Sequence, residues 1–179
     1  MIPALEMFAD GLSRVQESTL ELLSHSNSTA LIWAPAPAAN SQGWLVWHLT
    51  RVLDNQVAGV MNAVRPSSPV AEVWLSDGFE QRMALPYAKE DTGYGQSTAQ
   101  VRAFPAVDPQ LLAEYHRATQ EAVAAWVSTL DAAQLGAVVD DAWDPPVTAQ
   151  ARLVSVLDDV ARHIGQAEYI GGLIPVRKS

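Results

Sequence analysis

Four segments of the chain carry apolar side chains three and four positions apart, the spacing that places them along one side of an α-helix. These segments are residues 3–26, 41–64, 108–130 and 148–172. Helices of about twenty residues that are apolar on one side bury that side most simply by packing against one another. The pattern therefore predicts an all-α fold built on a four-helix bundle.

Capping residues and helix breakers mark the ends of these segments. Pro66 ends the second helix, and Asp108 with Pro109 supplies an N-cap and a first-turn proline for the third. Thr148 is a capping residue for the fourth helix, and the glycine pair at 171–172 is expected to end it.

A long connection, residues 65–107, joins the second and third helices. Connections of this length in compact domains are usually functional or partly structured. We expect short helices at residues 79–83 and 98–104. Large apolar side chains are predicted to pack on the bundle, namely Trp74, Phe79, Leu85 and Tyr94. Outside the helices, only short β-branched stretches such as 138–139 suggest a strand.

Composition narrows the class of protein. The 179 residues suit a single domain, 1–179, and 49% hydrophobic against 17% charged residues is enough for a sizeable core. Eleven basic and twenty acidic residues give a net charge of −9, which argues against nucleic acid and anionic membrane as partners.

The chain contains no cysteine, so a metal site would have to use histidine and carboxylate ligands. No apolar run approaches the roughly 20 residues of a membrane span, and the N-terminus lacks the pattern of a signal peptide. We therefore expect a cytoplasmic protein.

Two of the four histidines face the predicted core. His48 and His163 lie on the apolar sides of the second and fourth helices, where a neutral imidazole needs a hydrogen-bond partner or a metal. Asp159 precedes His163 by one helical turn on the same side. We expect these three residues to meet and hold a divalent metal, with ordinary hydrogen-bonded core residues as the alternative. His25 and His116 are expected to point toward solvent.

The sequences around these residues resemble a known family. GWLVWHLTRVLDNQVA, residues 43–58, and DDVARHIGQAEYIGGLI, residues 158–174, resemble the two metal-binding helices of the DinB/YfiT-like superfamily, which includes the mycothiol-dependent maleylpyruvate isomerases. The resemblance implies a metal-binding four-helix bundle. Its ligands would be the histidine of a W-x-x-x-H-L motif, here His48, and a pair spaced four apart, here Asp159 and His163.

The resemblance also implies cofactors and partners. A low-molecular-weight thiol such as mycothiol would act as cosubstrate, together with a small-molecule substrate, and the protein would form a homodimer. Two histidines and one carboxylate with open positions are the donor set of catalytic zinc and non-haem iron centres; zinc or nickel is the expected metal. Asp159 stands where the isomerase branch has Glu, so its carboxylate reaches about one methylene less far.

Several other residues have simpler interpretations. Trp44, one turn before His48, is expected either to line the pocket or to pack in the core. Asp54 is predicted to pair with an arginine. The acidic residues of 140–144 lack the spacing of an EF-hand and are predicted to form a solvated loop. We expect three residues of the connection to line the mouth of the pocket, namely Asp91, Tyr94 and Gln96.

Three functions agree with this pattern. The first is a metal-dependent enzyme that carries out thiol transfer, thiol-assisted isomerisation or hydrolysis. The second is a metal-binding or stress-associated protein without turnover. The third is a bundle with a decayed metal site, in which Asp159 is hydrogen-bonded to His163.

Overall fold

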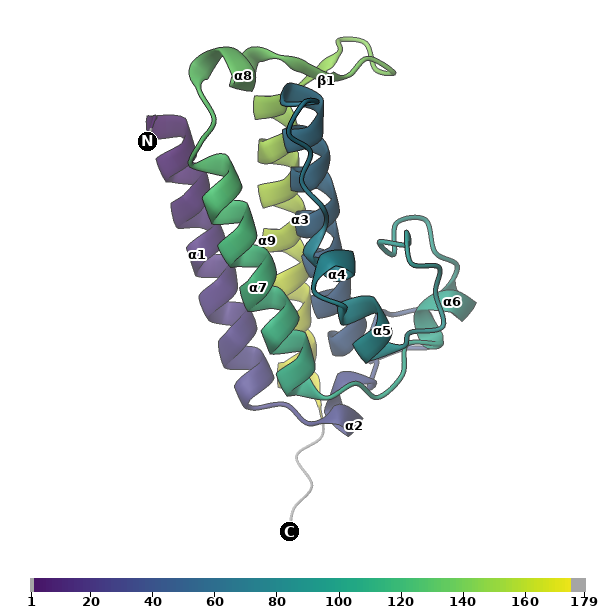
Figure 1. Ribbon diagram of the computed structural model, residues 1–179. Helices are drawn as coiled ribbons and strands as arrows, with labels where there is room; N and C mark the ends of the chain where they lie inside the picture. The colour runs from purple at the N-terminus through teal and green to yellow at the C-terminus, as the bar shows by residue number, and fades with distance from the viewer. Residues whose placement is uncertain (1, 175–179) are drawn as a thin grey trace.

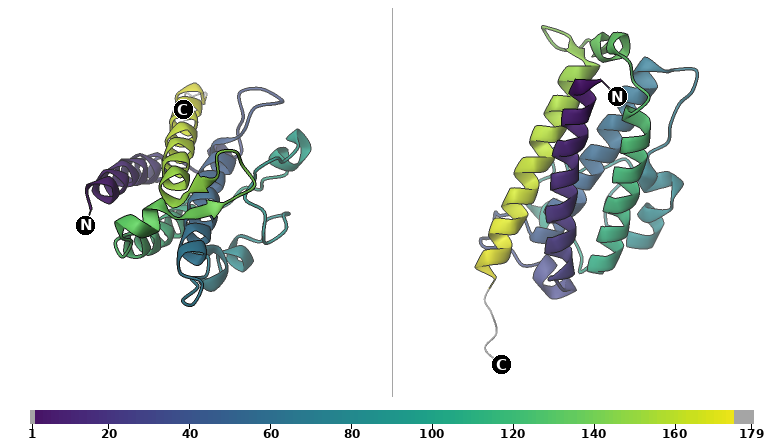
Figure 2. Two further views of the ribbon diagram at one scale, coloured as in Figure 1. Left: turned by 90° about the horizontal axis from the view of Figure 1, so that it is seen from above. Right: turned by 90° about the vertical axis from the view of Figure 1, so that its left-hand side faces the viewer.

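The computed structural model describes residues 2–174. Its four long helices are α1 (Pro3–Ser24), α3 (Gln42–Val64), α7 (Pro109–Val127) and α9 (Ala149–Leu173). They lie side by side (Figure 1), with α1 and α9 running in one direction and α3 and α7 in the other. Helices α1 and α3 each pack against both α7 and α9, which closes the bundle around its core (Figure 2). The predicted all-α bundle is confirmed.

Side-chain caps begin three of the long helices. Ser41, Asp108 and Thr148 each accept a hydrogen bond from a backbone N–H in the first turn of the helix that follows. The first helix has Pro3 in its first turn instead. These local signals explain why the starts of the helices could be predicted.

The end of α9 differs from the prediction, because the helix continues through its glycine pair to Leu173. Neither glycine has the left-handed backbone that ends a helix. Gly171 instead lies against Gln42, where a Cβ atom would come within 2.8 Å of the amide nitrogen. This glycine allows α9 to approach the start of α3.

The long connection contains α4 (Val73–Ser76), α5 (Phe79–Met83) and α6 (Thr98–Arg102), so both predicted short helices are present. Helix α4 packs against α3, α5 and α7. Trp74 and Phe79 are buried as predicted, and Leu85 is partly buried. Tyr94 is 92% exposed, so its predicted packing on the bundle is wrong. It lies in a turn between two glycines with positive φ, Gly93 and Gly95.

Short elements cover the two ends of the bundle. Helix α2 (Ser28–Leu31) lies where α3 begins, and α8 (Ala132–Gly136) lies at the other end with strands β1 (Val138–Asp140) and β2 (Val147–Thr148). The strands pair antiparallel, with Val138 opposite Thr148. Within residues 2–174, no helix is both long and apolar enough to span a bilayer.

Candidate metal centre

Three polar side chains meet between α3 and α9, toward the end of the bundle at which α3 begins. His48 lies in the second turn of α3, and Asp159 and His163 lie one turn apart on α9. One possible ligand atom from each residue lies within 4.8 Å of the other two. The two imidazole rings have centroids 4.8 Å apart and planes at 69°. The fold thus brings His48 next to Asp159 and His163, although more than a hundred positions of the sequence separate them.

His48 is buried and is held on two sides. Its Nδ1 atom lies 2.5 Å from the carbonyl oxygen of Thr92, and its ring stacks on Trp44 with centroids 4.7 Å apart. Because a carbonyl oxygen only accepts hydrogen bonds, Nδ1 carries the proton and Nε2 of the neutral ring keeps its lone pair. Burial lowers the pKa of His48, which keeps the ring neutral near neutral pH. His48 therefore offers Nε2 as a ligand atom.

His163 contacts Gln166 through one ring nitrogen and Asp159 through the other. Nδ1 lies 2.9 Å from Oε1 of Gln166, and Nε2 lies 3.5 Å from Oδ1 of Asp159. With Nδ1 donating to Gln166, the neutral ring would turn a lone pair toward the carboxylate. A proton or a metal ion between the two groups removes that repulsion.

The pKa shifts of this pair follow from the same contact. The hydrogen bond to Asp159 raises the pKa of His163. Burial alone would raise the pKa of Asp159, but the hydrogen bond and positive charge of His163 lower it below its ordinary value. In the absence of a metal, a proton on His163 therefore stabilises the pair.

The donor set suits a divalent cation. Oδ2 of Asp159 is buried and has no hydrogen-bond partner among residues 2–174, an arrangement that costs free energy unless a cation or donor faces it. Zinc bonds to nitrogen and oxygen are about 2.0–2.2 Å long, so two ligand atoms of one ion lie at most about 4.4 Å apart. The present spread of up to 4.8 Å requires a small inward movement of the side chains.

The other two histidines lie away from this centre. His25 is exposed, as predicted. His116 is fully buried, so its predicted outward orientation is wrong. Tyr115 packs against Trp74 of α4 and Phe79 of α5, whereas His116 faces α3, so these two neighbouring residues of α7 are both buried. Nδ1 of His116 lies 2.9 Å from Oγ1 of Thr50.

A buried ionic cluster lies one turn beyond His48. Asp54 was predicted to pair with an arginine, and Arg51 Nη1 lies 3.7 Å from Asp54 Oδ2 and 2.8 Å from Glu72 Oε2. Asp54 also accepts hydrogen bonds from two backbone N–H groups at the start of α4 and from the hydroxyl of Tyr115. The cluster joins α3, α4 and α7. The sequence pattern gave no sign that Glu72 belongs to it.

The connection reaches the centre through residues 91–96. Gln96 Oε1 accepts a hydrogen bond from Trp44 Nε1 at 3.0 Å, and the Asp91 carbonyl accepts one from Arg51 Nε at 3.2 Å. Trp44 is only 5% exposed, so it both packs in the core and covers one face of His48. Sequence reasoning missed Thr92, because a backbone carbonyl has no side-chain signature.

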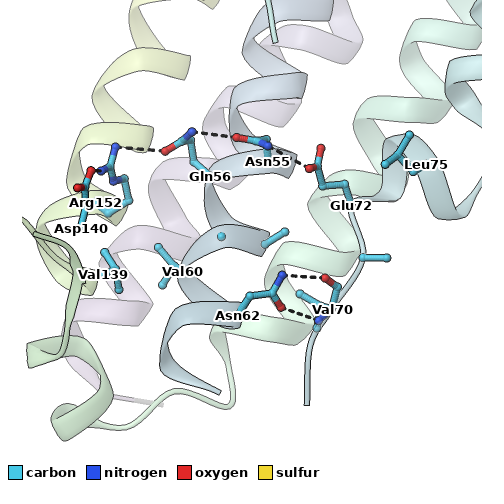
Figure 3. Close-up of a pocket in the computed structure, with 13 residues that line it drawn as sticks. Asn55, Gln56, Val60, Asn62, Val70, Glu72, Leu75, Val139, Asp140 and Arg152 are labelled. Carbon is cyan, nitrogen blue, oxygen red and sulfur yellow. Dashed lines mark hydrogen bonds and ion pairs between the residues drawn. The ribbon is translucent and has the colours of Figure 1, made fainter. Parts of the chain in front are cut away.

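A separate hollow of about 440 Å³ lies farther along α3, beside the start of α4 and β1. Hydrogen bonds cross its wall in a row (Figure 3) that runs from Asp140 through Arg152, Gln56 and Asn55 to Glu72. The three residues of the candidate centre do not line it. Asp141 and Asp144 are exposed as predicted, whereas Asp140 is half-buried and pairs with Arg152 at 2.6 Å.

Comparisons with known proteins agree with the fold. A crystal structure of a conserved protein from Enterococcus faecalis has 30% sequence identity and a TM-score of 0.84, covering 97% of this chain and 98% of its own. No curated protein gives a significant match. The family model of the DinB superfamily matches residues 12–167, a range that contains all three residues of the candidate centre. The chain therefore belongs to the DinB superfamily.

Proposed function

We propose that this protein is a divalent-metal-dependent enzyme that acts on a small molecule, with His48, Asp159 and His163 as the metal ligands. The proposal rests mainly on the hydrogen-bonding pattern that the two imidazole rings have in common. In each ring a carbonyl oxygen, of the Thr92 backbone or the Gln166 side chain, faces Nδ1 and leaves Nε2 for the centre. The buried, unpartnered Oδ2 of Asp159 supports it.

The chain's own residues would set the properties of this centre. Two neutral imidazoles and one carboxylate leave a divalent ion with a net positive charge and open coordination positions. Such an ion polarises a carbonyl group or lowers the pKa of a bound water or thiol. Trp44, which is buried and stacks on the His48 ring, would shield that side of the centre from water. We propose zinc or nickel as the metal.

The second reactant would be a low-molecular-weight thiol of the mycothiol type. The chain has no cysteine of its own, so any thiolate at the centre must come from solution. The resemblance to the mycothiol-dependent isomerases supports this cosubstrate. The reaction would then be thiol transfer, thiol-assisted isomerisation or hydrolysis of a small electrophile.

Elemental analysis of protein purified without an affinity tag tests metal binding. Substitution of the metal with cobalt tests whether a thiol binds to it. Cobalt-loaded protein should gain a thiolate-to-cobalt charge-transfer absorption band when a small thiol is added, and His163→Ala should lose it. Metal bound near one per chain, without a thiol signal, would support the metal centre and contradict the thiol cosubstrate. Purified protein without metal, unable to take up cobalt, would contradict the proposal as a whole.

A further inference from the structure

Three side chains on one stripe of α3 each direct a nitrogen to the same short segment of the connection. Trp44, His48 and Arg51 are spaced four and three residues apart, so they lie along one side of the helix. Their partners are Gln96 Oε1, the Thr92 carbonyl and the Asp91 carbonyl, all within residues 91–96. The segment is thereby attached to α3 over two helical turns, with His48 in the middle.

Gly93 allows this segment to approach the helix. Its φ is +92°, and a Cβ atom there would lie 2.7 Å from His48 Nδ1 and 2.9 Å from Trp44 Cζ2. Contacts below 3.0 Å force a neighbour to move, and both neighbours are rings packed in the core. Any residue other than glycine at position 93 would therefore push the Thr92 carbonyl and the His48 ring apart.

Arg51, which anchors the segment at Asp91, is itself buried and hydrogen-bonded. Arg51 is fully buried, bonds Glu72 and the Tyr115 hydroxyl, and lies 5.2 Å from the centroid of the Trp74 ring. A guanidinium with this many partners has little freedom to move. The Asp91 carbonyl is therefore held at a defined place, one residue before Thr92.

We propose that residues 91–96 are the positioning segment of the metal centre: the Thr92 carbonyl holds the Nδ1 proton of His48, so that Nε2 faces Asp159 and His163. This inference rests on the proposed function where it takes the bound group to be a divalent metal. Its geometric part, the protonation of Nδ1, concerns the metal-free chain as well. Outer partners that fix a ligand imidazole in this way typically contribute about 10- to 100-fold to metal affinity.

The experiment compares Gly93→Ala with Gly95→Ala. Both glycines have positive φ, so alanine strains the backbone at each position, but a Cβ at Gly95 meets nothing within 4 Å. Zinc affinity is measured by competition with a chromophoric chelator. We expect Gly93→Ala to weaken zinc binding about 10- to 100-fold and Gly95→Ala to leave it within about twofold. Equal affinities for both variants and the wild type, or equal losses, would overturn the proposal.

A spectroscopic measurement separates positioning from mere packing. In metal-free wild type labelled with ¹⁵N-histidine, NMR should show His48 protonated at Nδ1, and Gly93→Ala should lose this state. A wild-type His48 protonated at Nε2 alone would overturn the positioning role, even where Gly93→Ala fails to fold. If wild type shows the Nδ1 proton but binds neither zinc nor nickel, the proposed function fails and the geometric inference stands.

Discussion

The resemblance to the isomerase branch implies Glu at the position that Asp159 occupies in this chain. The three candidate ligand atoms lie up to 4.8 Å apart and would have to move inward to share one ion. Asp159→Glu lengthens the side chain by one methylene and supplies that reach. We expect zinc affinity to be preserved or raised in this variant, as measured by chelator competition. A tenfold loss would show that the shorter carboxylate is already well placed.

His116 should make the protein sensitive to acid. Burial lowers its pKa from 6.5 to about 3, so between these values the unfolded chain binds a proton at this residue that the folded chain does not. This histidine thus lowers the free energy of unfolding as the pH falls through that window, by up to about 1.4 kcal/mol per pH unit.

Urea unfolding at several pH values checks this expectation. His116→Gln removes the titrating group, and its stability should fall less steeply with acid than that of the wild type. His25→Gln, at an exposed position, is the matched control and should follow the wild type. Parallel pH profiles for all three proteins would argue against the role of His116.

Single residues show where sequence reasoning succeeds and where it fails. His48, Asp159 and His163 could be predicted because each lies on a regular apolar stripe and two of them are one turn apart. His116 could not be placed by the same method, because α7 contacts helices on two sides and buries adjacent positions. The partners of His48 escaped prediction because the Thr92 carbonyl belongs to the backbone and its position depends on tertiary contacts.

At the scale of elements, α4 depends on a buried carboxylate on α3. Two N–H groups at the start of α4 donate to Asp54, and Tyr115 on α7 donates its hydroxyl to the same carboxylate at 3.0 Å. Tyr115→Phe removes a hydrogen bond to a charged group and should lower the free energy of unfolding by roughly 1 to 3 kcal/mol.

The control for this substitution is Tyr169→Phe, because Tyr169 is 71% exposed on α9. In urea unfolding, the control should remain within about 0.5 kcal/mol of the wild type. If the two variants lose the same stability, the Tyr115 hydroxyl does not hold α4 and α7 to α3.

The starts of the long helices could be predicted from caps and prolines, whereas the course of the long connection could not. Its short helices follow local patterns, but the attachment of residues 91–96 to α3 depends on Arg51, Trp44 and His48 from another part of the chain. Local sequence determines where a helix begins, but it does not show which distant residues a connection contacts. The meeting of His48, Asp159 and His163 could therefore be predicted, and the contacts of residues 91–96 with His48 could not.

At the scale of the whole molecule, we propose a two-fold homodimer, the commonest form of soluble oligomer. Met7 on α1 and Val154 on α9 are 77% and 63% exposed and line an apolar hollow, which makes this face the proposed contact.

Light scattering tests the dimer. The wild type should have about twice the 19.3 kDa mass of one chain at micromolar concentration, and Val154→Arg should return it to the mass of one chain. A wild type with the mass of a single chain would contradict the proposal.

We propose that His48, Asp159 and His163 together hold one divalent metal ion. Calorimetric titration of metal-stripped wild type and His163→Ala with zinc tests it most directly, with nickel as the second ion. We expect about one zinc or nickel ion per wild-type chain, loss of this binding in His163→Ala, and a melting temperature of metal-loaded wild type that falls when chelator is added. Wild type that takes up neither metal near one per chain, with a melting temperature indifferent to chelator, would contradict it.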